Sequence, residues 1–214
     1  MKPPAERIKD IIKIFRKEYP KVRTALRHKS AFELLISTIL SAQCTDERVN
    51  KITPSLFKKY KGPRDFSRVK QAVLEKEIRS TGFYRNKAKN IIAASKKIVE
   101  DFGGRVPDAM EKLTSLPGVA RKTANIVLSS SFHKAEGIAV DTHVKRLSER
   151  IGLSKEKDPN KIEKDLIDIV PRKDWIDFNY FLVDHGRAVC MARRPLCPEC
   201  VIKHLCPSAK KFYP

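Results

Sequence analysis

Apolar residues recur every three to four positions along most of the chain, which is the spacing of a helix that buries one face. The N-terminal stretch shows this spacing at Ile8, Ile11, Ile12 and Phe15. The pattern predicts an amphipathic helix that ends near Tyr19, because a proline follows that residue.

The most apolar helix is expected to begin after Ser30. Ser30 and Glu33 have the spacing of a capping box, whose two side chains bind backbone N–H groups at the start of a helix. The positions that follow form a broad apolar stripe of Phe32, Leu35, Ile36, Ile39 and Leu40. We therefore predict a central buried helix, from whose C-terminal end the segment 41–43 emerges.

The next segments show shorter helical patterns. Asp46 is expected to cap a helix that Pro54 kinks or breaks. A loop at Gly62 and Pro63 should then precede a short helix over about residues 69–78.

The remaining pattern is also helical. A turn at 81–84 should precede a helix that stops at 103–104, and further helices are expected from Asp108 and near 142–151, 160–170 and 174–189. No stretch alternates with a period of two for long enough to form a strand, so the predicted fold class is all-α.

Composition adds a partner to this picture. The chain has 214 residues, enough for one large or two small domains, and its 45 Lys and Arg against 25 Asp and Glu give a net charge of +20. Such a charge favours a polyanion as partner, with nucleic acid ahead of an anionic membrane, although a merely soluble surface is the alternative. No apolar run has the length of a membrane span and no secretory signal pattern is present, so an intracellular, soluble protein is expected.

Four of the five cysteines lie close together near the C-terminus: Cys190, Cys197, Cys200 and Cys206. Four thiolates suit either tetrahedral zinc or an iron–sulfur cluster. Structural zinc usually uses two C-x2-C pairs and only one tight pair occurs here, while disulfides are not expected inside a cell. Cys44 lies outside this spacing and is interpreted as a small apolar filler.

Candidate chemistry concentrates between Leu116 and Arg146. The turn from Leu116 to Ala120 separates two helical patterns, so its N–H groups and the dipole of the new helix suit an anion. Lys122 falls on the first turn of that helix. Gly82 and Lys87 loosely repeat the spacing of Gly118 and Lys122, one residue out of step, which is too weak to indicate a repeat.

Lys122 and Asp141 each have two interpretations. Val119 and Ile126 share a helix face with Lys122, and this apolar stripe is expected to desolvate the amine and favour its neutral, nucleophilic form. Alternatively, Lys122 only binds phosphate. Asp141 lies where a helix N-cap is expected, and as an ionised cap it can also stabilise developing positive charge.

These motifs resemble the helix-hairpin-helix DNA glycosylases, and in particular the endonuclease III family. The resemblance rests on LPGVARKTAN (116–125) with VDTHVKR (140–146), LISTILSAQCTD (35–46), TGFYRNK (81–87) and the four cysteines, and covers nearly the whole chain. Ala120 stands where that family usually has a second glycine. If the position needs a positive φ, Ala120 is strained.

The resemblance implies two helical lobes with a DNA-binding cleft between them. Residues 24–136 would form a helical barrel with the helix-hairpin-helix, and residues 1–23 with 137–214 an iron–sulfur lobe. Lys122 and Asp141 would face each other across the cleft. The cysteine spacing matches the iron–sulfur loop of the family, which implies a [4Fe–4S] cluster on Cys190, Cys197, Cys200 and Cys206.

The implied activity is that of a bifunctional DNA glycosylase and AP lyase of base excision repair. It would remove oxidised or damaged pyrimidines from duplex DNA and cleave 3′ to the abasic site by β-elimination, through a Schiff base on Lys122, with Asp141 assisting loss of the base. A monomer is expected, cytoplasmic and nucleoid-associated if the source is prokaryotic.

The family also implies DNA contacts. The backbone grip would comprise Pro117, Gly118, Val119, Ala120 and Arg121, and the cations of the cysteine loop would include Arg193 and Arg194. Gln43 would fill the space of the extruded base rather than simply end a helix. Phe83 would be either a wedge in the duplex or plain core.

Two histidines and two rival classes complete the expectations. His143 is interpreted as a helix-surface residue, and His185 as either a phosphate contact or a structural hydrogen bond.

Mismatch-specific adenine or thymine glycosylases share the turn but generally lack the lysine at the position of Lys122. A non-catalytic helix-hairpin-helix module would need neither Asp141 nor the cluster.

Overall fold

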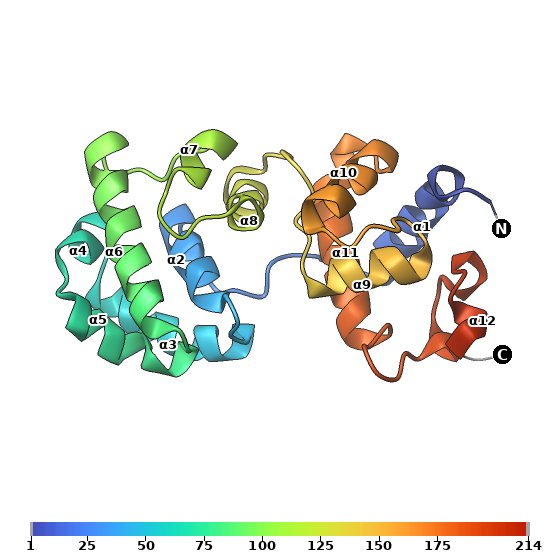
Figure 1. Cartoon of the computed structure of the whole chain (residues 1–214), viewed down its shortest axis with the longest axis horizontal. Helices are drawn as coiled ribbons and strands as arrows, with labels where there is room; N and C mark the ends of the chain where they lie inside the picture. Colours follow the sequence, from blue (N-terminus) through green and yellow to red (C-terminus); the bar gives the residue numbers. More distant parts are fainter. Residues whose placement is uncertain (1, 213–214) are drawn as a thin grey trace. The chain divides into compact units, whose positions relative to one another are not determined.

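The computed structural model describes residues 2–212, and every regular element within them is a helix (Figure 1). The prediction of an all-α protein is therefore confirmed. No helix in this described part of the chain is long and apolar enough to cross a membrane.

The chain divides into two compact units. One unit comprises Met1–Arg23 and Ala135–Pro214, and the other is the continuous segment Thr24–Lys134. Each unit has its own cluster of buried apolar side chains. The sequence placed the second boundary two residues later, after 136.

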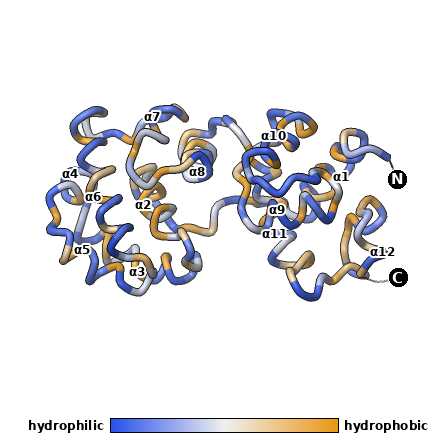
Figure 2. The backbone as a smooth tube through the Cα atoms, viewed as in Figure 1, coloured by the Kyte–Doolittle hydropathy of each residue, from blue (hydrophilic) through white to orange (hydrophobic). Residues whose placement is uncertain are grey.

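The continuous unit is built around one buried helix. Its elements are α2 (Ala31–Ser41), α3 (Asp46–Lys59), α4 (Pro63–Arg68), α5 (Gln71–Ile78), η1 (Arg79–Thr81), α6 (Tyr84–Asp101), α7 (Met110–Thr114) and α8 (Arg121–Phe132). In α2 the residues from Phe32 to Leu40 are buried apart from Glu33, and the helix is among the most apolar parts of the tube in Figure 2. This confirms the predicted central helix.

The start of α2 follows the predicted cap with one difference. The Oγ of Ser30 accepts a hydrogen bond from the backbone N–H of Glu33 at 3.2 Å. The carboxylate of Glu33 accepts from the N–H of Lys29 at 2.6 Å rather than from that of Ser30, as a strict capping box would have it.

The expected cap of α3 is wrong, and the expected break at Pro54 does not occur. Thr45, not Asp46, is the N-cap, and its Oγ1 accepts from the N–H of Arg48 at 3.2 Å. Asp46 is the first helical residue, where its negative charge complements the helix dipole. Pro54 lies inside the continuous helix, and Val49 before it and Leu56 after it are both buried.

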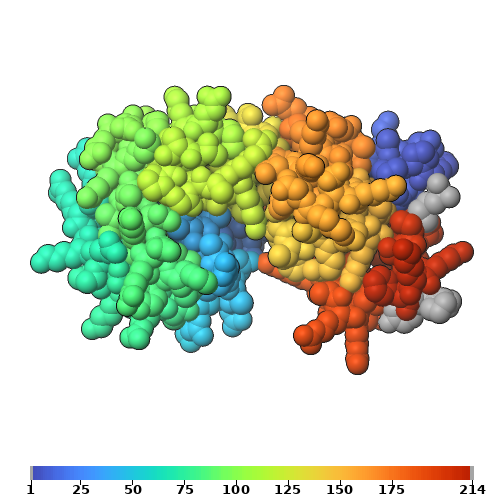
Figure 3. Space-filling view, viewed as in Figure 1, coloured from blue at the N-terminus to red at the C-terminus, as the bar shows by residue number. Residues whose placement is uncertain are grey.

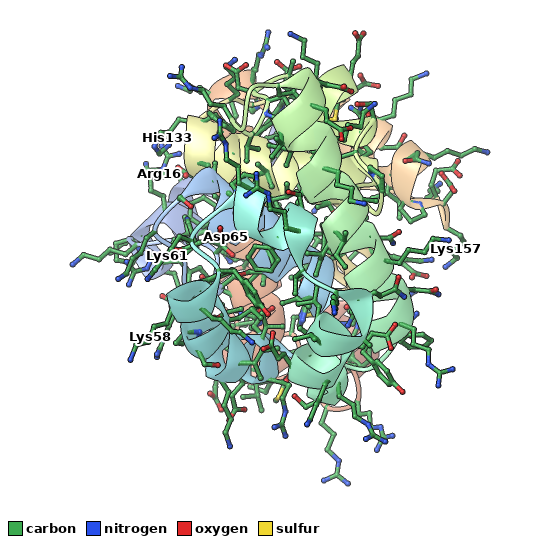
Figure 4. The ribbon with its side chains drawn as sticks, turned by 90° about the vertical axis from the view of Figure 1, so that its left-hand side faces the viewer. Arg16, Lys58, Lys61, Asp65, His133 and Lys157 are labelled. Carbon is green, nitrogen blue, oxygen red and sulfur yellow. The ribbon has the colours of Figure 1, made fainter. Side chains whose placement is uncertain are left out.

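The expected loop at Gly62 and Pro63 is instead the start of α4. Gly62 is the N-cap and Pro63 the first helical residue, a position that suits proline because its N–H would have no intrahelical partner. The carboxylate of Asp65 accepts from the backbone N–H of Lys61 at 2.7 Å and steadies this start. Both residues are labelled in Figure 4.

The other unit combines the N-terminal helix with the last third of the chain. Its elements are α1 (Pro4–Glu18), α9 (Thr142–Ile151), α10 (Pro159–Ile169), η2 (Arg172–Asp174), α11 (Trp175–Ala188), η3 (Cys197–Glu199), η4 (Lys203–Leu205) and α12 (Ala209–Phe212). The buried guanidinium of Arg7 on α1 donates to the carbonyl oxygens of Ile151, at 3.0 Å, and of Leu205. This arginine therefore fastens the N-terminal helix to the ends of α9 and η4.

Candidate functional site

The turn between α7 and α8 is held by two buried side chains. Leu116 is 2% exposed and Val119 is 6% exposed, and the N–H of Val119 donates to the carbonyl oxygen of Leu116 at 3.1 Å. Gly118 lies between them with a φ of +77°, and a Cβ there would approach Asn90 to 2.8 Å. The turn therefore requires glycine at 118 for both its backbone conformation and its space.

Ala120 is unstrained. It is the N-cap of α8 with φ −85° and ψ 168°, a conformation that any residue adopts, so the missing second glycine costs no backbone strain. A methyl group cannot accept a hydrogen bond, and α8 has no side-chain cap. The first N–H groups of α8 thus lie at a helix start that has no capping side chain, as an anion site requires.

Lys122 is exposed on the first turn of α8. The prediction that an apolar stripe desolvates this amine is wrong for the protein without DNA. Val119 is buried and Ile126 half-buried, so the stripe belongs to the face that packs on the core and does not cover Lys122.

The predicted backbone grip separates into exposed and buried residues. Gly118, Ala120 and Arg121 are exposed and Pro117 is half-buried. The side chain of Val119 packs in the core, so only its backbone is left to contact a phosphate.

Asp141 lies in the other unit and caps α9. Its Oδ1 accepts from the N–H of Val144 at 2.8 Å, which confirms the predicted N-cap. The cap fixes the direction of the half-buried carboxylate at the positive end of the helix dipole.

The residues that follow Asp141 connect it to the cysteine loop. His143 is half-buried rather than on the surface, and its Nδ1 accepts from Arg146 at 3.1 Å. Burial lowers the pKa of His143, and the cationic Arg146 and Arg187 lower it further, against the opposing effect of Asp141. Arg146 also donates to the carbonyl oxygen of Cys190 at 3.2 Å. Sequence reasoning gave Arg146 no role of its own, because the carbonyl groups of Gly186 and Cys190 that it binds are distant along the chain.

The four C-terminal cysteines line one pocket in the unit that contains α9. Apolar side chains, among them Ile151, Val189 and Ile202, complete its walls. The thiols are free, and burial raises the pKa of Cys200 to about 11 and raises those of Cys197 and Cys206 as well. Buried thiols become thiolates when a metal supplies the compensating positive charge, so the donor set fits an iron–sulfur cluster.

Two further side chains hold the cysteine loop. Arg150 donates to Cys190 Sγ at 3.5 Å and to the carbonyl oxygens of Met191 and Ala192, both at 2.7 Å. His185 is 1% exposed and contacts Cys200. Of the two interpretations of His185, the structural hydrogen bond is therefore correct.

The predicted cations of the cysteine loop are on its surface. Arg193 and Arg194 are exposed between the first two cysteines, and Lys203 and His204 are exposed between the last two. In the space-filling view the segment that follows α11 forms part of the visible surface and carries projecting side chains (Figure 3).

Gln43 and Phe83 share an unusual backbone. Both are exposed, and both have left-handed conformations, with φ of 53° and 46°. Phe83 is 63% exposed, so its interpretation as core is wrong. Sequence reasoning predicted a turn at 81–84 and placed Gln43 at the end of the central helix, but gave no signal for these conformations, which are uncommon outside glycine and asparagine.

Positive charge also lies away from the turn. In the continuous unit a groove beside α3 is lined by Arg27, His28, Lys29, Lys58 and Lys61, together with Glu33 and the apolar Pro54 and Phe57. Lys58 and Lys61 extend from the ribbon in Figure 4. The net charge of +20 is thus partly gathered in a surface groove.

Comparisons with known proteins agree with this fold and site. Residues 36–172 match the model of the HhH-GPD superfamily of base excision DNA repair proteins, and residues 190–206 match the iron–sulfur binding domain of endonuclease III. The second match begins at Cys190 and ends at Cys206. Fold and site together define a helix-hairpin-helix base excision repair protein.

Full-length relatives narrow the class. Endonuclease III of Synechocystis sp. is 53% identical over 205 residues, covering 96% of this chain and 94% of the relative. Endonuclease III of Bacillus subtilis is 46% identical, with 90% and 88% covered. The chain belongs to the endonuclease III family.

Solved structures support the same assignment. A trapped covalent intermediate of endonuclease III with DNA has a TM-score of 0.92 at 42% identity, with 99% of both chains covered. A thermostable thymine-DNA glycosylase has a TM-score of 0.87 at 24% identity, covering 96% and 98%, which shows a shared fold alone.

Membership of this family confirms the expected activity class. The chain is a bifunctional DNA glycosylase and AP lyase of base excision repair, its partner is duplex DNA with damaged bases, and its cofactor is a [4Fe–4S] cluster. The alternatives of a non-catalytic helix-hairpin-helix module and of a tetrahedral zinc site are therefore rejected.

Proposed function

We propose that Lys122 is the nucleophile of the reaction. The observation that carries the proposal is the position of Lys122, which is exposed on the first helical turn of α8. The loop before it suits a phosphate, because it contains Gly118 and leads into a helix start without a capping side chain. A phosphate bound at this turn would present the neighbouring sugar to the amine.

The chemistry requires few groups. The lone pair of neutral Lys122 Nζ attacks C1′ of the flipped nucleotide, and the glycosidic bond breaks with its electron pair leaving on the base, which takes up a proton. The nitrogen then gives up a proton and its lone pair expels O4′, which takes up a proton, so the sugar ring opens to a protonated Schiff base. Loss of a proton from C2′ then expels the 3′ phosphate, so the strand breaks by β-elimination. Because Lys122 is exposed without substrate, contact with DNA must remove its hydration.

Asp141 would stabilise the positive charge that develops on the sugar as the base departs. The bond from the N–H of Val144 holds the carboxylate in one direction before substrate arrives. A group that is already oriented costs no reorganisation at the moment of reaction, which is the basis of electrostatic catalysis.

Gln43 and Phe83 would occupy the duplex once the base leaves it. A base must be extruded before an enzyme reaches its sugar, and the gap and the orphaned partner must then be held. Both side chains are exposed at the tips of tight turns, and Phe83 is a large apolar residue that is suited to stacking between bases. We assign damaged pyrimidines as the substrates because the chain belongs to the endonuclease III family.

Lys122 and Asp141 would act on the same sugar of the bound DNA. The turn at 117–121 would hold one stretch of backbone, and Arg193 and Arg194 another. Cys190, Cys197, Cys200 and Cys206 would hold the cluster, which when bound cross-links the loop that carries these arginines. The working location would be the cytoplasm, at the nucleoid.

Borohydride reduction tests the assignment of the nucleophile directly. It converts a Schiff base to a stable amine, so protein incubated with duplex DNA containing an oxidised pyrimidine becomes covalently linked. Digestion and mass spectrometry should find the sugar remnant on the peptide that contains Lys122. A remnant on any other lysine would overturn the assignment.

A further inference from the structure

Lys87 is a buried lysine whose ammonium group is held by backbone carbonyl groups. It lies on the first turn of α6 and is 5% exposed, whereas lysines are almost never fully buried unless their ammonium groups are paired. Its Nζ donates to two backbone carbonyl oxygens, that of Leu40 at 2.8 Å and that of Thr81 at 2.7 Å. Burial lowers the pKa of this amine.

The two carbonyl groups belong to segments that are distant in sequence. Leu40 lies in the last turn of α2, where carbonyl oxygens have no intrahelical donor. Thr81 is the last residue of η1, immediately before the turn into α6. A single nitrogen therefore ties the C-terminal end of α2 to the start of α6.

Each of these carbonyl groups lies just before a residue with a left-handed backbone, Gln43 or Phe83; His133 is a third such residue, at the end of α8. Gln43 follows Leu40 by three positions and Phe83 follows Thr81 by two. Leu40 and Thr81 are 0% and 2% exposed, while Gln43 and Phe83 are exposed and left-handed. Non-glycine residues keep such conformations only where the surrounding structure fixes them. The bonds of Lys87 supply a fixed point at the base of each turn.

We propose that Lys87 is a positioning residue for base extrusion, which sets the Gln43 turn and the Phe83 turn in register so that both side chains enter the duplex together. This inference rests on the proposed roles of Gln43 and Phe83. Lys87 itself is buried and acts only through the backbone of the two turns.

The competing explanation is that Lys87 stabilises the core and nothing more. The two explanations differ in which substrate suffers when the bonds are lost. In a duplex the enzyme must hold a gap and an orphaned base, whereas a single-stranded abasic site has neither. A positioning role predicts a loss on duplex alone, and a purely structural role predicts equal losses on both substrates.

The experiment compares two single-turnover rates for each variant: base excision from a fully paired duplex, and strand cleavage at a single-stranded abasic site. Lys87→Met keeps the length and apolar stem of the side chain but removes its donors. The ratio of duplex rate to single-strand rate should fall about tenfold, as expected when two buried carbonyls lose a charged donor. An unchanged ratio would overturn the proposal.

A matched control separates this effect from lost stability. Ile98 is fully buried about three turns further along α6, so Ile98→Ala destabilises the same helix by a cavity. With both variants assayed equally far below their melting temperatures, Ile98→Ala should keep the parental ratio. A ratio that falls equally in Ile98→Ala would also overturn the proposal.

Conservative variants keep the test decisive if Lys87→Met does not fold. Lys87→Arg retains a cationic donor, so its ratio should stay above that of Lys87→Met. Lys87→Gln has a shorter, neutral donor and should give an intermediate ratio. A parental ratio in Lys87→Gln together with a lowered ratio in Lys87→Arg would contradict a role for the hydrogen bonds.

A double-mutant cycle distinguishes failure of this inference from failure of the proposed function. The double variant Gln43→Ala/Phe83→Ala should itself have a lower ratio than the parent. Adding Lys87→Met to this double variant should lower the ratio little further, because Lys87 acts through those two residues. A parental ratio for the first variant would refute the roles of Gln43 and Phe83. A lowered ratio there with a fully additive effect of Lys87→Met would refute only the role of Lys87.

Discussion

The Nε2 atom of His185 lies 3.3 Å from the Sγ atom of Cys200, and the other ring nitrogen lies 2.8 Å from the hydroxyl of Tyr19. Burial lowers the pKa of His185 to about 4, so the ring is neutral at pH 7 and has one donor and one acceptor. This contact joins α1 to a cysteine of the cluster pocket through a single buried ring.

Loss of the Tyr19 hydroxyl should therefore weaken the cluster-containing unit. Tyr19→Phe keeps the ring but removes a hydrogen bond to a buried nitrogen, and we expect the free energy of unfolding to fall by about 1 kcal/mol. Tyr84→Phe, a half-buried tyrosine of α6 in the other unit, is the matched control. Denaturant unfolding of the cluster-loaded protein measures both, and equal stability of the two variants would contradict the prediction.

Lys122→Gln should abolish strand cleavage and borohydride trapping while binding to damaged duplex stays within about threefold, since one cationic contact among many contributes little. Lys122→Arg preserves the charge yet cannot form a Schiff base, so it should bind like the parent and still not be trapped. Exposed Lys112 of α7 provides a control, and Lys112→Gln should be trapped normally. Full trapping of Lys122→Gln would place the nucleophile elsewhere. Buried Lys87 is then a poor candidate.

Asp141→Asn tests the negative charge of this side chain separately from its role as a helix cap. Asparagine caps a helix about as well as aspartate, so the melting temperature should change by no more than about 2 °C. Excision should fall by about 10²–10³, the typical contribution of a preorganised electrostatic group. Asp158, whose Oδ1 accepts from the N–H groups of Asn160 and Lys161, is a cap away from the proposed chemistry. Asp158→Asn should excise at the parental rate. A parental rate for Asp141→Asn would reduce that residue to a cap.

Replacing a cluster ligand should act through architecture. Cys200→Ser removes one of four thiols from the pocket, so iron content and the melting temperature should both fall and DNA binding should weaken. Cys44→Ser, which changes the cysteine outside the pocket, should retain its iron. Iron analysis and visible absorbance report the first effect. Retention of a full cluster by Cys200→Ser would remove Cys200 from the ligand set.

Gly118 and Ala120 in the turn before α8 should differ in their tolerance of substitution. Gly118→Ala places an alanine with a left-handed backbone against Asn90. The free energy of unfolding should therefore fall by more than the roughly 1–2 kcal/mol that the backbone conformation alone costs, and DNA affinity should fall with it. Gly103 has a φ of +59° with open space around its Cβ position, so Gly103→Ala isolates the conformational cost. Ala120→Gly should change stability by no more than about 0.5 kcal/mol. Thermal unfolding ranks the three variants.

The sequence alone determined the helices wherever the signal was local. Spacing of apolar residues and the caps at Ser30 and Asp141 predicted α2 and α9, because a helix forms its hydrogen bonds within its own segment. The errors were local too: Thr45 displaced Asp46 as a cap, and Pro63 began a helix where a loop was expected. The motif residues and the four cysteines also carried enough information to indicate the family.

Burial was decided by the tertiary structure. Lys87 and Lys122 occupy similar places after a glycine turn at the start of a helix, yet Lys87 is buried between two carbonyl groups and Lys122 is exposed. No property of either short segment separates them. The difference arises because Leu40 of α2, distant in sequence, supplies an acceptor for Lys87 in addition to the nearby Thr81. The burial of a side chain depends on which other segments cover it rather than on its own neighbours in the chain.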